Sequence, residues 1–259
     1  MRAFVAGFGL ELRIVRAAPD ALIPLVTAPL FALIFLSIVR ESGRPDLQAD
    51  ALMAPVLMTL WWIALQNAGN MITGDRWQAL LEPLLATPAS LASVLLGRIV
   101  ALTCLGLVSF LEVWAIGELV YGVSIPFEHP VALGLTLLVT ALATAGVSVA
   151  FAPVFVLTRN AYTFTNSLSY PLYLLGGVLV PVAILPGWIQ PVSSVIFMSW
   201  SADLLRASLK PSPIDDLWQR LGMVFLLGAI SFLIGRALLF HVMQRMRCLL
   251  YTSPSPRDS

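Results

Sequence analysis

Long apolar runs separated by short polar stretches dominate the chain. Five of these runs cover residues 22–39, 52–72, 99–120, 131–157 and 217–240, and a further one begins near Thr163. A helix needs about 20 predominantly apolar residues to cross the hydrocarbon core of a bilayer. The pattern therefore predicts an all-helical polytopic membrane protein with six transmembrane helices.

The composition agrees with this interpretation and limits what else the chain can hold. Of its 259 residues 59% are hydrophobic and 11% are charged, with a mean hydropathy of +0.90, whereas soluble domains carry about 25% charged residues. Six crossings and their loops use nearly the whole length, so we expect a single membrane domain over residues 1–247. Any chemistry in the water phase must then come from a partner.

Residues 1–18 precede the first apolar run and are amphipathic. At 100° per residue on a helix, one face carries apolar side chains and a neighbouring face carries arginines; the two sets are Phe4, Phe8, Leu12 and Val15, and Arg2, Arg13 and Arg16. We expect an interfacial helix that lies on an anionic leaflet. A basic flank that orients the first crossing is a second, compatible interpretation.

A charged region, residues 73–98, separates the second apolar run from the third. It carries Asp75, Arg76, Glu82 and Arg98. Thr87 can cap a new helix whose first position is Pro88, where the missing N–H costs nothing. The apolar run that follows is too long for one perpendicular crossing, so its first turns are expected outside the hydrocarbon. The sequence predicts a short helix, a break and a long helix. Together they would form a surface on which another protein could exert force.

Residues 176–206 are apolar but broken. Pro181, Pro186 and Pro191, together with Gly187, exclude one straight helix. Broken backbone at membrane depth must be buried in protein or line a cavity. We therefore expect a re-entrant helix that dips into the membrane from one side.

Polar residues inside the apolar runs are candidates for a substrate pathway. Glu112 is a carboxylate within the third crossing, which marks a functional site by default, although a hydrogen-bonded or snorkelling glutamate near the outer end is the other interpretation. Gln66 begins a polar stripe in the second crossing, and such stripes more often join helices. The six candidates are Asn67, Asn70, Glu112, Asn166, Tyr170 and Tyr173.

The sequence offers no catalytic constellation. The only lysine, Lys210, is followed by Pro211, whereas a phosphate-binding Walker A loop needs Gly-Lys-Ser/Thr. His129 and His241 fall on opposite sides of the predicted membrane, so neither a metal cluster nor a nucleophile with its base is expected. With Glu112 as the one candidate for ion coupling, the remaining energy source is an external motor acting on a cytoplasmic surface.

Basic residues predict the orientation. With six crossings and the N-terminus inside, the inner segments hold nine arginines and the outer segments hold five basic residues. This excess predicts that both termini are cytoplasmic. Residues 248–259 resemble a translated sequencing adapter, so we expect a non-native tail; an ordinary disordered tail is the alternative.

Two of these regions together resemble the type-two ATP-binding-cassette (ABC) exporter permeases of bacterial drug, lipid and polysaccharide export. The first matches the family pattern of acid, Arg, Leu, Glu, two Leu, Thr and Pro, with Asp75, Arg76, Leu81, Glu82, Leu84, Leu85, Thr87 and Pro88. The second is similar to the broken extracellular segment, through Leu185, Pro186, Trp188, Gln190, Ala202, Asp203 and Arg206. The chain departs from the usual residues at Trp77, Ala79, Leu80 and Phe197.

The resemblance implies an assembly of two permease subunits, expected as a homodimer, with two soluble ATPase subunits that bind ATP and Mg²⁺. It implies that a hydrophobic or amphipathic small molecule, a lipid or a glycan moves outward across a bacterial inner membrane, with no nucleic acid partner. ATPase coupling falls on Asp75, Arg76, Trp77, Leu81, Glu82, Thr87 and Pro88. The re-entrant region contributes Gly177, Pro181, Pro186, Trp188, Gln190, Asp203 and Arg206.

Two other functions compete with this one. A secondary carrier or channel would show inverted repeats or more charge within the membrane, and neither is seen. A membrane enzyme of lipid metabolism would need a cluster of acids or histidines. An exporter permease without an ATPase of its own is therefore our first prediction.

Overall fold

A computed structural model describes residues 2–17, 22–77, 91–122, 128–157 and 161–252. This part of the chain contains helices and turns and no strand, which confirms the all-helical prediction. The helices are α1 (Arg2–Ala17), α2 (Ile23–Ser42), η2 (Pro45–Leu47), α3 (Gln48–Trp77), α5 (Leu91–Gly106), α6 (Val108–Tyr121), α7 (Pro130–Leu157), α8 (Ala161–Leu175), η3 (Val182–Ile184), α9 (Gln190–Ser194), α10 (Phe197–Ser208) and α11 (Leu217–Thr252).

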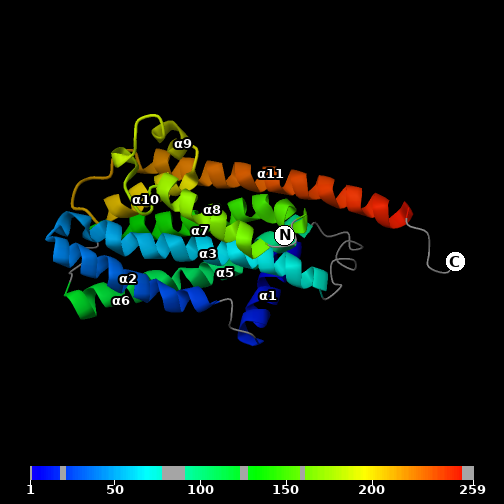
Figure 1. Ribbon diagram of the computed structural model, residues 1–259, viewed down its shortest axis with the longest axis horizontal. Helices are drawn as coiled ribbons and strands as arrows, with labels where there is room; N and C mark the ends of the chain where they lie inside the picture. The colour runs from blue at the N-terminus through cyan, green and yellow to red at the C-terminus, as the bar shows by residue number, and fades with distance from the viewer. Residues whose placement is uncertain (1, 18–21, 78–90, 123–127, 158–160, 253–259) are drawn as a thin grey trace.

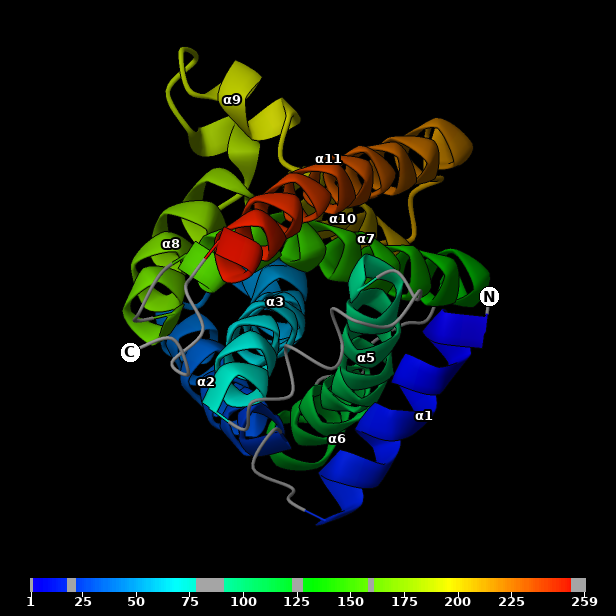
Figure 2. The ribbon, with the colours of Figure 1, turned by 90° about the vertical axis from the view of Figure 1, so that its right-hand side faces the viewer.

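The long helices run side by side along the long axis of the molecule, and α1 crosses them steeply near one end (Figures 1 and 2). We call this the α1 end; it holds α1, the end of α3 and the start of α5. The opposite end holds the turn between α2 and α3 and the last turn of α6, and we call it the Gly43 end. The described parts of the charged region, in α3 and α5, thus lie toward one end of the bundle, and the broken region lies toward the other.

Within the described part of the chain, five helical stretches are long and apolar enough to cross a membrane: Ile23–Ser42, Pro45–Gln66, Ser93–Tyr121, Pro130–Phe155 and Leu217–Val242. They correspond to the predicted first four crossings and the last. The predicted fifth falls on α8, whose 15 residues extend about 22 Å at 1.5 Å per residue. A crossing helix needs about 20 residues, so α8 as a membrane crossing, and with it the total of six, remains a prediction.

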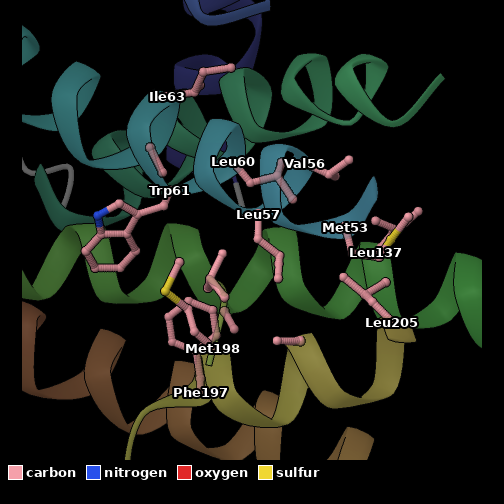
Figure 3. Packing of buried hydrophobic residues seen from close by; sticks show 14 of the residues in the cluster. Met53, Val56, Leu57, Leu60, Trp61, Ile63, Leu137, Phe197, Met198 and Leu205 are labelled. Atoms are coloured by element: carbon pink, nitrogen blue, oxygen red, sulfur yellow. The ribbon is translucent and has the colours of Figure 1, made fainter. Parts of the chain in front are cut away.

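Trp61 of α3 anchors the core. Its side chain is 1% exposed, and its Nε1–H donates to Ser169 Oγ of α8 at 3.1 Å. The indole packs edge-on against Phe151 of α7 and tilted against Phe197 of α10, each with ring centroids 6.4 Å apart. Such pairs contribute about 0.5–1.5 kcal/mol beyond the area they bury. Figure 3 shows the surrounding apolar side chains of α3, α7 and α10 gathered in one cluster. One residue therefore joins four helices.

Glycines bring α7 and α11 into close contact. A Cβ at Gly228 would lie 2.5 Å from Cα of Ala143, and a Cβ at Gly146 would lie 2.5 Å from the carbonyl oxygen of Gly228. Gly235 meets Ala150 in the same way. Small residues let helices approach closely where lipid removes the hydrophobic drive for association. The fourth apolar run is rich in such residues: Ala141, Ala145, Gly146, Ser148 and Ala150.

The region after α8 is broken as the prolines predict. Gly177 takes the left-handed conformation, with φ +65°, and η3 and α9 follow as short helices. Trp188 is 79% exposed, whereas α10 is largely buried and packs against α3, α7 and α11. The break is thus confirmed, and the re-entrant position in a membrane stays a prediction. The third crossing is also interrupted, because α5 ends at Gly106 and α6 begins at Val108.

Candidate functional site

A groove of about 290 Å³ lies between α2, α3 and α8. Its walls are mainly apolar and aromatic, with a few hydroxyl and amide groups. The lining residues are Ile23, Pro24, Thr27 and Phe31 of α2, Met58, Thr59 and Trp62 of α3, and Asn166, Ser169, Tyr170 and Tyr173 of α8. The structure therefore brings together three of the six predicted pathway residues, all from α8.

The spacing of the α8 residues explains why they share this groove. Asn166, Tyr170 and Tyr173 stand at positions i, i+4 and i+7, which fall on one helix face. Tyr173 is 4% exposed, and its hydroxyl donates to the carbonyl oxygen of Met58 at 3.3 Å. Tyr170 is 70% exposed and meets the Tyr173 ring edge-on, with centroids 6.4 Å apart. One tyrosine is therefore fixed in the wall while the other offers a free aromatic surface.

The α3 wall was missed in the sequence. Trp61 and Trp62 are neighbours there, yet successive helical residues point about 100° apart. Trp61 consequently enters the core, and Trp62 lines the groove beside Thr59. Helical periodicity alone predicts that Trp61 and Trp62 point in different directions. Which of the two faces a cavity depends on where α8 lies, and the sequence does not show this.

The other three pathway candidates lie elsewhere. Glu112 is on α6, half-buried and outside the residues that line the groove. Its Oε2 is buried without a hydrogen-bond partner among the described residues. Asn67 and Asn70 lie on α3 beyond the groove, toward the α1 end, and their side-chain positions are outside what the structure describes. The structure thus does not unite the six candidates in one site.

Of the residues predicted to couple to an ATPase, the structure describes only the first three. Asp75, Arg76 and Trp77 form the last turn of α3, and their side-chain positions are not described. Leu81, Glu82, Thr87 and Pro88 lie outside the described residues. What the structure does show is that α3 continues from the groove-lining residues to this last turn.

A buried ion pair joins α1 to α5 near the coupling region. Arg98 Nε lies 2.8 Å from Glu11 Oε2, and the two side chains are 8% and 4% exposed. Removing one partner of such a pair leaves an uncompensated buried charge, which is strongly destabilising. The signal available in the sequence was the position of Glu11, which falls among Phe4, Phe8 and Val15 on the apolar face of the first helix.

Close backbone packing accompanies this pair. A Cβ at Gly7 would meet the carbonyl oxygen of Val94, and a Cβ at Gly97 would meet that of Phe4. The predicted amphipathic helix is present, but its face with Phe4, Phe8 and Val15 packs into the protein instead of remaining free for lipid. The reason is that one glycine on each helix, Gly7 of α1 and Gly97 of α5, lets the two backbones approach closely. The exposed apolar side chains of α1 are Val5, Leu10 and Ile14.

Near the Gly43 end, Arg206 of α10 forms a second buried polar centre. Its side chain is 7% exposed and forms an ion pair with Asp50 in the first turn of α3. Nη1 lies 3.6 Å from Asp203 Oδ1. Nη2 donates to the carbonyl oxygens of Gly177 and Val178, the latter at 3.2 Å. Arg206 therefore holds the turn after α8 against both α10 and α3.

Three of the predicted re-entrant residues, Gly177, Asp203 and Arg206, meet in this centre. Asp50 completes it and was not among the predicted site residues, because it reads as part of the polar loop before the second crossing. The other four predicted re-entrant residues lie outside the Arg206 centre. Pro181 lines a neighbouring cavity of about 260 Å³ together with Asp50. The other three belong to an exposed turn, in which Gln190 Nε2 donates to the carbonyl oxygen of Leu185 at 3.0 Å: Pro186, Trp188 and Gln190.

The bundle and its apolar spans define a polytopic helical membrane protein that carries a mainly apolar groove between α2, α3 and α8. The family model for ABC-2 type transporters matches residues 13–209, which is more than half of the chain. The protein therefore belongs to the ABC-2 type transporter family, and the resemblance seen in the sequence is confirmed. A search of curated proteins gave no match. Membership in this family makes the chain a membrane transport component and not itself a catalyst.

Proposed function

We propose that this chain is the permease subunit of an ATP-driven exporter that moves a hydrophobic or amphipathic small molecule, a lipid or a glycan out of the cytoplasm. A separate soluble ATPase subunit supplies the energy and binds ATP and Mg²⁺. Family membership supports the transport role. The observation that carries the substrate side of the proposal is the groove between α2, α3 and α8.

The chemistry of the groove suits an amphipathic substrate. Binding sites for small molecules are mostly apolar and aromatic, with a few polar groups that fix orientation. Here Phe31, Trp62 and Tyr170 supply apolar or aromatic surface, while Asn166 and Thr59 supply hydrogen-bonding groups. No charged side chain is among the described lining residues, so a neutral or weakly polar body fits better than a fixed charge.

The continuity of α3 supports coupling to an ATPase. The helix has 30 residues and extends about 45 Å at 1.5 Å per residue. It contributes Met58, Thr59 and Trp62 to the groove and ends at Trp77 within the coupling region. We propose that an ATPase docks on Asp75, Arg76, Trp77, Leu81, Glu82, Thr87 and Pro88, and that α1, paired to α5 through Glu11 and Arg98, lies beside it.

We further propose that the permease works as a homodimer in a bacterial inner membrane, with the α1 end and both termini in the cytoplasm. The excess of arginines in the segments assigned to this side supports that orientation. A second copy would complete the groove, since exposed residues such as Ile23 and Tyr170 leave it open on one side.

Co-purification tests the coupling. The chain would be co-expressed with the ATPase encoded by the neighbouring gene, as wild type and as the charge reversal Asp75→Arg, Arg76→Glu and Glu82→Arg. We expect the ATPase to co-purify with wild type and to be lost from the reversal. The matched control is Glu118→Arg, an exposed residue at the Gly43 end, which should retain the ATPase. If wild type never captures an ATPase, a secondary carrier or channel becomes the better proposal.

A further inference from the structure

A separate cavity of about 350 Å³ lies at the Gly43 end, between α2, α3 and α6. It is distinct from the groove between α2, α3 and α8, which is lined by the first half of α2. The lining combines two apolar residues with a cationic and polar rim. The residues are Leu36, Val39, Arg40, Gly43, Arg44, Pro45, Gln48 and Tyr121.

Gly43 places both arginines on this cavity. Its φ of +63° ends α2 in the left-handed conformation, which glycine adopts at little cost. The N–H of Gly43 donates to the carbonyl oxygen of Arg40 at 3.2 Å, and the N–H of Arg44 donates to that of Val39 at 3.4 Å. Because the chain reverses here, Arg40 before the turn and Arg44 after it line one space.

The two guanidinium groups are available to a ligand. Among the described residues the Arg40 side chain has no ion-pair partner. Arg44 pairs with Asp46 at 2.9 Å, but the two side chains are 61% and 60% exposed, and such surface pairs contribute little. The described lining of the cavity contains no carboxylate. An anion would therefore meet two arginines, with Asp46 as a competitor for one of them.

The depth of the cavity fits a lipid headgroup. Arg40 lies two residues before the end of the candidate span Ile23–Ser42, and Tyr121 ends the span Ser93–Tyr121. Polar and aromatic anchors of this kind mark the boundary between hydrocarbon and headgroups. Tyr121 is fixed there, because its hydroxyl donates to the carbonyl oxygen of Leu33 at 2.9 Å and lies 2.6 Å from Ser37 Oγ. Leu36 and Val39 continue the wall toward the hydrocarbon side.

We propose that this cavity binds the phosphate of an anionic phospholipid, with Arg40 and Arg44 as donors and the acyl chains lying along α2 and α6. Guanidinium groups bind phosphate through paired, charge-assisted hydrogen bonds. The apolar wall selects a phosphate that carries chains over a free one. This assignment does not depend on an ATPase or on transport.

Native mass spectrometry of the detergent-purified protein tests the proposal. The titrants are phosphatidylglycerol, phosphatidylcholine, diacylglycerol and glycerol 3-phosphate, which separate net charge, chains and phosphate. We expect wild type to prefer phosphatidylglycerol. Arg40→Gln and Arg44→Gln should each weaken its binding about tenfold, equivalent to about 1.4 kcal/mol. Arg40→Lys should keep part of the binding, because the charge remains while the paired hydrogen bonds of the guanidinium group are lost.

The matched control is Arg220→Gln, which removes an arginine that does not line the cavity; it should bind phosphatidylglycerol like wild type. Thermal unfolding in detergent would confirm that all variants are folded. Unchanged binding in the Arg40→Gln/Arg44→Gln double variant would overturn the site. So would an equal loss in Arg220→Gln. Competition by glycerol 3-phosphate as strong as that by phosphatidylglycerol would overturn the lipid assignment.

Discussion

Arg98 Nε lies 2.8 Å from Glu11 Oε2 across 87 residues of sequence, and both side chains are almost fully buried. The pair fixes the first helix to the helix that follows the coupling region. Glu11→Gln removes the carboxylate charge from this buried pair, so we expect a loss of about 3–5 kcal/mol of stability. Unfolding of the purified protein in detergent measures this loss. A double exchange, Glu11→Arg with Arg98→Glu, should recover part of it.

The control on the same helix is Arg13→Gln, because Arg13 is exposed. Its effect should stay within about 0.5 kcal/mol. If Glu11→Gln is as mild as Arg13→Gln, the buried pair does not hold α1 in place.

Arg206 should tolerate no replacement, including lysine. Its guanidinium contacts Asp50 and the carbonyl oxygens of Gly177 and Val178 at once, whereas a lysine ammonium cannot reproduce this planar fork. We expect Arg206→Lys to cost about 1–3 kcal/mol, because one ammonium group cannot hydrogen-bond to Asp50 and both carbonyl oxygens and so leaves a buried acceptor unsatisfied. Limited proteolysis of residues 176–206, together with unfolding, provides the measurement.

Asp203→Asn gives the comparison for this centre. Asp203 is 55% exposed and lies 3.6 Å from Arg206, so its ion pair should contribute less than about 1 kcal/mol. Equal sensitivity of Asp203→Asn and Asp50→Asn would contradict the assignment of Asp50 as the principal partner.

Substitutions of the two groove tyrosines should have different effects, one on transport and the other on stability. Tyr170→Ala removes an exposed ring, so we expect altered transport in proteoliposomes with nearly unchanged stability. Tyr173→Phe removes one hydrogen bond to Met58 and should cost about 0.5–1.5 kcal/mol. Normal transport of every tested amphipathic substrate by Tyr170→Ala would exclude this ring from the pathway.

Close packing of α7 on α11 predicts opposite effects of two alanine substitutions in one helix. Gly228→Ala would push a methyl group into Ala143, whereas Gly222→Ala meets nothing within 4 Å. We expect the first to destabilise by about 1–3 kcal/mol and the second to be neutral or stabilising by up to about 1 kcal/mol. Melting temperatures of the two variants test this prediction, and an equal effect of both substitutions would contradict the close packing at Gly228.

Features set by local sequence could be predicted, and features set by the packing of distant helices could not. The apolar runs gave the five long spans, and Pro181, Pro186 and Pro191 gave the break after α8, because both depend on neighbouring residues. The shared face of Asn166, Tyr170 and Tyr173 followed from helical period. The partners Glu11–Arg98 and Asp50–Arg206 did not follow, because each pairing depends on how two helices far apart in sequence are placed.

Hydrogen bonds join two of the helices that line the groove to each other, and the third to a helix outside it. Trp61 to Ser169 and Tyr173 to Met58 join α8 to α3, whereas Tyr121 joins α6 to α2 through Leu33 and Ser37. The groove lies between α2 on one side and α3 with α8 on the other. Its width therefore depends on how α2 packs on α3, which none of these hydrogen bonds fixes.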